Sequence, residues 1–123
     1  MTILTEGRHA GEFILSEGDA GYSRDNAIVA SGAGVITPGT ILAKVTASGK
    51  YVPSPATGSD GSQTAIAVAI GGCDATSADA KVAVISRAAQ VKAVALTYES
   101  TVNDGTKKAA KHTQLAAQGI IVR

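Results

Sequence analysis

Large aromatic side chains are nearly absent from this sequence of 123 residues, which has no Trp, one Phe and three Tyr. A core must therefore be built mostly from small aliphatic residues, which supply most of the 45% apolar content. Such residues pack closely, but each buries little area, and burial stabilises by roughly 25 cal/mol per Å². A chain of this length forms one domain. The thin core suggests that contacts between subunits bury further surface.

Cysteine and net charge are also scarce. Cys73 is the single cysteine, which excludes an intrachain disulfide and a paired-cysteine metal site. Eleven Lys and Arg against ten Asp and Glu give a net charge of +1, whereas domains that bind nucleic acid usually carry a clustered basic excess. The one tight basic cluster is Lys107, Lys108 and Lys111, which we interpret as a solvated helix face. No nucleic-acid partner is expected.

Long hydrophobic runs are missing as well. The longest uncharged stretch, 26–43, is interrupted by Gly and Pro, so it does not read as a membrane span. The N-terminus has no apolar run after a basic start, which argues against a secretory signal. We expect neither a membrane partner nor export.

Residues that carry chemistry do not form a recognisable pattern. His9 and His112 lie far apart and lack the spacing of metal ligands. No histidine is placed to orient Ser23 and Asp25 as a catalytic triad. The sequence therefore predicts no metal, no cofactor and no catalytic residue, and the protein is not expected to be an enzyme.

Short apolar runs between turn residues dominate the middle of the chain and predict strands over 41–45, 51–52, 64–70, 81–87 and 91–96. In 64–70, alternate positions place Ile66, Val68 and Ile70 on one face. The opposite face carries Ala65, Ala67 and Ala69. Because both faces are apolar, the strand should be buried on both sides, and its alanine side is our candidate for the contact between subunits.

The C-terminal zone predicts one helix over about 106–118. Asn103 or Asp104 can cap its start, and Gly119 occupies the position of a terminating glycine. A short strand over 120–122 should follow. The predicted fold is thus mainly β with one C-terminal helix, an α+β chain forming a compact small β-barrel or β-clip-like domain.

The N-terminal zone, residues 1–22, holds glycines at 7, 11, 18 and 21 and one apolar island, Phe13 to Leu15. We interpret it as a flexible arm that precedes a β-rich domain over 23–123, because it has too little apolar surface to fold alone. A second interpretation stays open, in which Phe13 to Leu15 form a permanent edge strand of the domain.

The stretch "FILSEGDAGYSRDNAIVASGAGVITPGTILAKV", residues 13–45, resembles the phage lambda-type head decoration protein D family. The resemblance continues through "DGSQTA" at 60–65, "DAT" at 74–76, the Lys-rich helix and the ending "LAAQGIIVR". It covers residues 12 to the end.

The resemblance implies a β-rich homotrimer on the outside of an expanded phage head, assembled in the host cytoplasm. There it binds the major capsid protein at three-fold positions and stabilises the coat lattice. On this basis Glu12, Phe13, Ile14 and Leu15 are the expected capsid contact, adding an extended segment to a coat-protein strand edge.

Two alternatives belong to other functional classes. The run "GTILAKVTASGKYVPSPATG" is similar to biotinyl or lipoyl carrier domains, although Lys44 and Lys50 lack the flanks of a modified lysine. A small trimeric β-fold nucleotide hydrolase would need clustered Asp, Arg and Ser motifs that the sequence does not contain.

Overall fold

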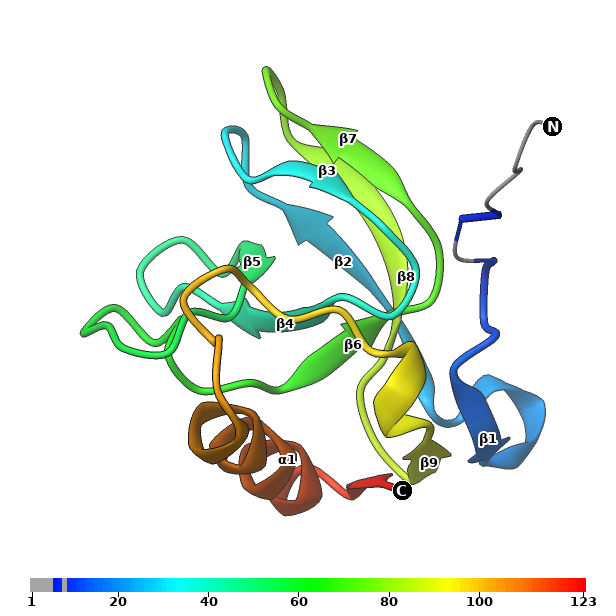
Figure 1. The fold of residues 1–123 in the computed structure, drawn as a ribbon. Coiled ribbons are helices and arrows are strands. Elements are labelled where there is room, and N and C mark those ends of the chain that lie inside the picture. The colour runs from blue at the N-terminus through cyan, green and yellow to red at the C-terminus, as the bar shows by residue number, and fades with distance from the viewer. Residues whose placement is uncertain (1–5, 8) are drawn as a thin grey trace, which may run out of the picture.

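The computed structural model describes residues 6–7 and 9–123 (Figure 1). Short strands dominate, and the only α-helix within the described residues lies near the C-terminus, as predicted. In chain order the elements are β1 (Ile14–Glu17), η1 (Asp19–Gly21), β2 (Arg24–Val29), β3 (Gly34–Ile36), β4 (Ile41–Lys44), β5 (Tyr51–Pro53), β6 (Ala67–Ala69), β7 (Cys73–Ala75), β8 (Ala80–Ile85), β9 (Ala89–Val91), η2 (Ala93–Ala95), α1 (Gly105–Ala117) and β10 (Ile120–Val122), where η marks a 3₁₀ turn.

Five strands close into a barrel in the order β2-β5-β4-β6-β8. Alternate residues of these strands point inward, and the interior cluster combines Val29, Leu42 and Val84 with the small Ala67 and Ala69. A narrow barrel has room for alanines where larger side chains would collide. The predicted small β-barrel is confirmed.

A second layer lies against the outside of the barrel. It consists of α1 and a three-stranded sheet in the order β1-β9-β10 (Figure 1). Between this layer and the barrel lies the second apolar cluster, which includes Phe13, Val68, Val91 and Leu115. The chain therefore has two small cores that share the wall of the barrel.

The third sheet is a two-stranded ribbon, β3 with β7, paired through Gly34–Ala75, Val35–Asp74 and Ile36–Cys73. Its inward residues, Ile36 and Ala75, belong to the same cluster as the barrel interior. The ribbon thus extends the barrel core at one end of the molecule.

The predicted helix forms with the predicted cap. The Asp104 carboxylate accepts a hydrogen bond of 2.8 Å from the Lys107 N–H, which satisfies one of the free donors of the first turn. After the last turn Gly119 has φ +83°, a left-handed conformation that glycine adopts without steric cost. The chain then enters β10, which confirms the terminal strand.

The expected strand over 91–96 is wrong beyond Val91. The chain turns into the 3₁₀ segment η2 because its backbone donors find other partners: the Lys92 N–H bonds Phe13 O, and the Ala93 N–H bonds Arg123 O. Both partners lie far from 91–96 in sequence, so no local pattern signals the break.

Within the described residues no helix has the length and apolar character needed to cross a lipid bilayer.

Candidate interaction surfaces

Phe13, the centre of the expected capsid-binding segment, lies inside the molecule with no exposed surface. Its carbonyl accepts a hydrogen bond of 2.8 Å from the Lys92 N–H, and the preceding Gly11 N–H bonds Ile70 O at 2.9 Å. The flexible-arm interpretation therefore needs correction for this part of the chain. Phe13 is the largest apolar side chain available, and it fills the core between the barrel and the three-stranded sheet.

The neighbours of Phe13 form the edge strand of the second interpretation. Ile14 pairs with Val91 and packs against the core, while Leu15 lies at a bulge and is 48% exposed. Glu12 is half-exposed. The boundary of the folded body thus falls near residue 11 and not at residue 22. Of the four residues expected to contact the coat, Leu15 offers the most surface to a partner.

Strands β1 and β10 are the two outer strands of the three-stranded sheet, so among residues 6–7 and 9–123 each has one edge without a strand partner. On the solvent side of this sheet a shallow hollow of about 230 Å³ is present. It is lined by Ser16, Ala88, Ala89, Gln90, Gly119 and Ile121. None of these side chains is charged, and Ile121 is 42% exposed. A neutral face between two open strand edges can accept a protein partner.

Ala65, Ala67 and Ala69, the expected subunit contact, have no exposed surface. The strand that forms is the shorter β6, Ala67–Ala69, and one chain covers both of its sides: Ala67 and Ala69 face the barrel interior, and Val68 faces the outer cluster. Ala65 lies before this strand and belongs to the outer cluster, so the three alanines do not share one face. The alanine face is therefore not available to a second copy. A closed barrel buries the inner face of a strand without any partner chain, which a single strand pattern cannot distinguish from an interface.

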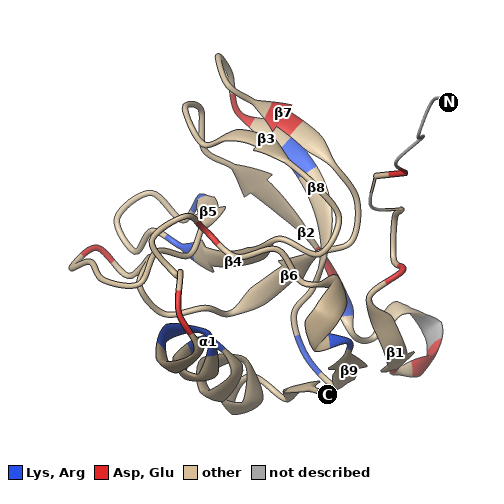
Figure 2. Cartoon of the chain, in the orientation of Figure 1, with Lys and Arg blue, Asp and Glu red and all other residues tan. Residues whose placement is uncertain are grey.

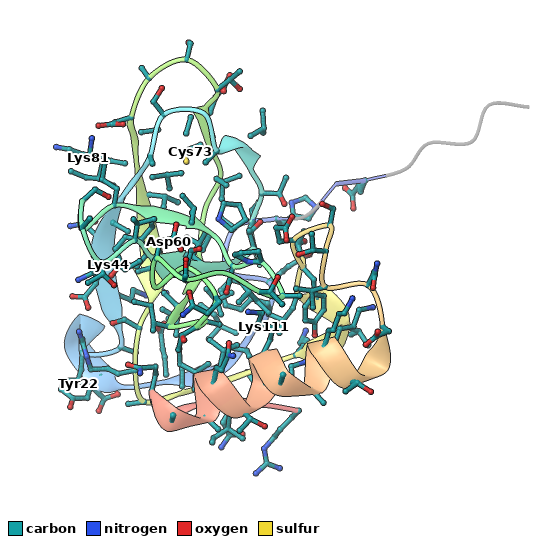
Figure 3. All side chains as sticks on the ribbon, turned by 90° about the vertical axis from the view of Figure 1, so that its left-hand side faces the viewer. Tyr22, Lys44, Asp60, Cys73, Lys81 and Lys111 are labelled. Atoms are coloured by element: carbon teal, nitrogen blue, oxygen red, sulfur yellow. The ribbon has the colours of Figure 1, made fainter. Side chains whose placement is uncertain are left out.

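Lys111 lies on the buried face of α1, contrary to the expected solvated cluster. Its side chain is 2% exposed (Figure 3). The ammonium donates to Ser54 Oγ at 2.9 Å, to Pro55 O at 2.6 Å and to Gln63 O at 2.7 Å. Lysine has three N–H donors, so the three bonds satisfy them. Burial lowers the pKa of Lys111, and the charge of Glu99 opposes that shift.

The sequence does contain a signal for this burial. Leu115 is the only leucine in α1, and Lys111 precedes it by one turn on the same face. Because residues four apart share one face of a helix, the apolar face that contains Leu115 predicts that Lys111 points toward the core. Lys108, by contrast, is exposed and lies 5.2 Å from the centre of the Tyr98 ring.

His112, on the same helix, is half-buried. Its Nε2 is 2.5 Å from the Tyr98 hydroxyl. Burial lowers the pKa of His112 below its usual value, which favours the neutral ring, whose Nε2 can accept a hydrogen bond from the Tyr98 hydroxyl. The pair ties α1 to the segment that follows η2.

Cys73 is half-buried beside Asp74 (Figure 3). Burial and the Asp74 charge raise the pKa of its thiol, the opposite of what activates a nucleophile. Within the described residues, no group of three or more His, Cys, Asp or Glu is placed to hold a metal ion.

Charged residues, both acidic and basic, are distributed over many elements of the fold (Figure 2). Lys50, one of the two lysines weighed as a carrier site, forms an ion pair of 2.7 Å with Asp79. Lys44 lies at the end of β4, with its ammonium 5.8 Å from the centre of the Tyr51 ring. The structure thus gives both lysines ordinary surface contacts.

Comparison with known proteins gives one family. A family model described as the bacteriophage lambda head decoration protein D matches residues 3–120, nearly the whole chain. A search of curated proteins finds no match. The match spans the barrel, the ribbon, α1 and the three-stranded sheet up to the first residue of β10.

Proposed function

Because this chain belongs to the bacteriophage lambda head decoration protein D family, and so has a structural role associated with the capsid, we propose that it binds the outside of an expanded phage head. It binds there as a trimer at three-fold positions and stabilises the coat lattice. The family match over residues 3–120 is the observation that carries this proposal.

The architecture supports such a role. A closed barrel has no free strand edge, so the body resists unwanted strand pairing. Within the part of the chain that the structure describes, open edges remain on the three-stranded sheet and on the β3–β7 ribbon. A lattice clamp needs a rigid body with a few restricted contact surfaces, and this fold provides one.

The coat contact involves the residues that precede β1 together with exposed Leu15. The chain enters the body at Gly11, whose N–H bonds Ile70 O, three residues before β1 begins. Residues before this point can extend along a coat subunit while β1 stays anchored by Phe13. Main-chain hydrogen bonds give such strand additions their affinity, and side-chain pockets give them specificity.

Trimer formation makes weak contacts sufficient. Each subunit brings one N-terminal contact, and once the first has formed the others act at high effective concentration. The overall affinity can then exceed that of a single contact by about 10²–10⁴-fold. Expanded heads present the matching three-fold arrangement.

Co-sedimentation of the purified protein with expanded and unexpanded heads tests the proposal. The full chain should pellet with expanded heads to saturation at three copies per three-fold position, and should stay in solution with unexpanded heads. A variant lacking residues 1–10, which keeps Gly11 and Phe13, should remain folded and trimeric but lose most of its binding.

Three outcomes would count against the proposal in different ways. A full chain that pellets with neither kind of head contradicts the function. Equal binding by the shortened variant moves the coat contact away from the N-terminus. Saturation at one copy per three-fold position contradicts the trimer.

A further inference from the structure

Two sheets pack face to face at the end of the molecule where the β3–β7 ribbon covers the β2–β8 pair (Figure 1). Ile36 and Ala75 point inward from the ribbon, and Ala27 and Val82 point inward from β2 and β8. Because successive residues of a strand face opposite sides, the intervening residues lie on the two outer faces. This end therefore has two flanks on opposite sides of one core.

The first flank carries Val35 and Asp74, which are direct cross-strand partners. Val35 is 68% exposed. Asp74 is exposed, and its Oδ1 accepts hydrogen bonds from the Thr76 N–H at 3.0 Å and the Thr76 hydroxyl at 2.6 Å. These bonds lower the pKa of Asp74, so its carboxylate is charged and held in place beside an exposed valine.

The second flank carries Ile28 and Lys81, which are also direct cross-strand partners. Ile28 is 44% exposed. Lys81 is exposed and projects from the side of the molecule (Figure 3). Each flank thus presents one β-branched apolar side chain next to one charge, and the two charges have opposite signs.

Other charges around these two sheets are compensated within the chain. Lys50 pairs with Asp79, Arg24 pairs with Glu17, and Arg87 pairs with Asp25. Asp74 and Lys81 differ, because within the described part of the chain neither forms an ion pair. The two uncompensated charges of this end lie one on each flank.

We propose that the flank of Val35 and Asp74 on one copy of this chain packs against the flank of Ile28 and Lys81 on the next copy. This inference rests on the proposed trimer and identifies the surface that forms it. A head-to-tail contact needs two different, complementary patches on each subunit, and it closes into a ring when the rotation between subunits allows.

Complementarity selects a second copy as the occupant. Packing flank on flank brings Val35 against Ile28 and Asp74 against Lys81, so each apolar side chain and each charge meets its match. Two identical flanks would instead place like charges together, which is destabilising. In this proposal the two flanks form the subunit contact that the sequence predicted at Ala65, Ala67 and Ala69.

Charge reversal tests this contact by light scattering on a size-exclusion column at low salt. Lys81→Glu alone and Asp74→Lys alone each place like charges in every contact of the ring. Their mass should therefore fall from about three chains toward one. The double variant Lys81→Glu with Asp74→Lys restores opposite charges with the sides exchanged, and its mass should return to about three chains.

Lys92→Glu is the matched control, because Lys92 is exposed on the link between β9 and η2 and its reversal changes the net charge as Lys81→Glu does. It should stay trimeric. Thermal melts of all variants report whether loss of the Asp74–Thr76 hydrogen bonds has unfolded the chain. Lys81→Glu leaves these hydrogen bonds intact, so it tests the contact independently of them.

The possible results separate this inference from the proposed function. If both single variants remain trimers, the flanks do not form the contact while the trimer itself stands. If the single variants stay trimeric but no longer bind heads, the flanks face the coat, which also overturns the inference. A monomeric parent overturns both the trimer and its interface.

Discussion

Single residues determine how this small molecule compensates for its lack of large aromatic side chains. Phe13 is placed where two layers meet, and it closes the gap that alanines leave there. Inside the barrel the opposite holds, since Ala67 and Ala69 fit where the walls approach each other. Neither placement could be predicted from the local sequence, because an apolar island and an alanine row look alike in an interface and in a core.

His112 gives the folded chain a pH dependence that can be measured. Its pKa lies below the usual 6.5 when the chain is folded, because burial disfavours the charged ring. As the pH falls through 6.5, the unfolded chain therefore binds a proton before the folded chain does. The free energy of unfolding should decrease over this range and level off below the folded pKa.

Urea unfolding at pH 7.5 and pH 5.5 measures this effect. The parent should unfold at a lower urea concentration at pH 5.5, and His112→Gln should remove most of the difference. His9→Gln serves as the control and should behave as the parent does. Carboxylates with lowered pKa, such as Glu17 and Asp25, lose their contribution only at more acidic pH. An unchanged pH response in His112→Gln would mean that another group titrates.

Among the helices and strands, the sequence predicted correctly those features that depend on interactions between residues close together in the chain. The helix has its cap at Asp104 and its terminating glycine at Gly119, and both act within a few residues of the chain. Strand β1 was only the second of two interpretations, and the turn η2 was missed, because distant partners define both, as when the Lys92 N–H bonds Phe13 O. Lys111 is an intermediate case. Its spacing from Leu115 predicted a buried side chain, whereas its charge predicted an exposed one.

Lys111 couples α1 to the loop over 54–63, and removing its charge should weaken that coupling. Lys111→Met keeps the apolar stem but leaves Ser54 Oγ, Pro55 O and Gln63 O without their donor. Unsatisfied buried acceptors are costly, so the free energy of unfolding should fall by about 2–3 kcal/mol. Lys108→Met, an exposed substitution one turn earlier, should cost about 0.5 kcal/mol or less.

Chemical denaturation of both variants is followed by circular dichroism at one protein concentration. Light scattering under the same conditions reports whether the association state has changed. Equal unfolding midpoints for Lys111→Met and the parent would show that water satisfies these oxygens as well as the ammonium does. The hydrogen bonds of Lys111 would then be a consequence of the fold and would not contribute to its stability.

For the whole molecule, fold class and family were both accessible from the sequence, whereas surfaces were not. Alternating patterns and turn residues gave a small β-barrel with a C-terminal helix, and residue order along the chain gave the decoration protein family. Surfaces depend on which faces remain exposed after all layers have packed. For that reason the exposed pairs Val35–Asp74 and Ile28–Lys81 emerged only from the folded chain.

The stability of DNA-filled heads tests the central claim most directly. Expanded heads lacking this protein are heated with and without saturating amounts of it, and DNA release is followed with a dye that cannot enter intact heads. If the chain stabilises the coat lattice, release should occur at a clearly higher temperature when the protein is bound. The same release temperature at full occupancy would show that it coats the head without stabilising it, and would contradict the account.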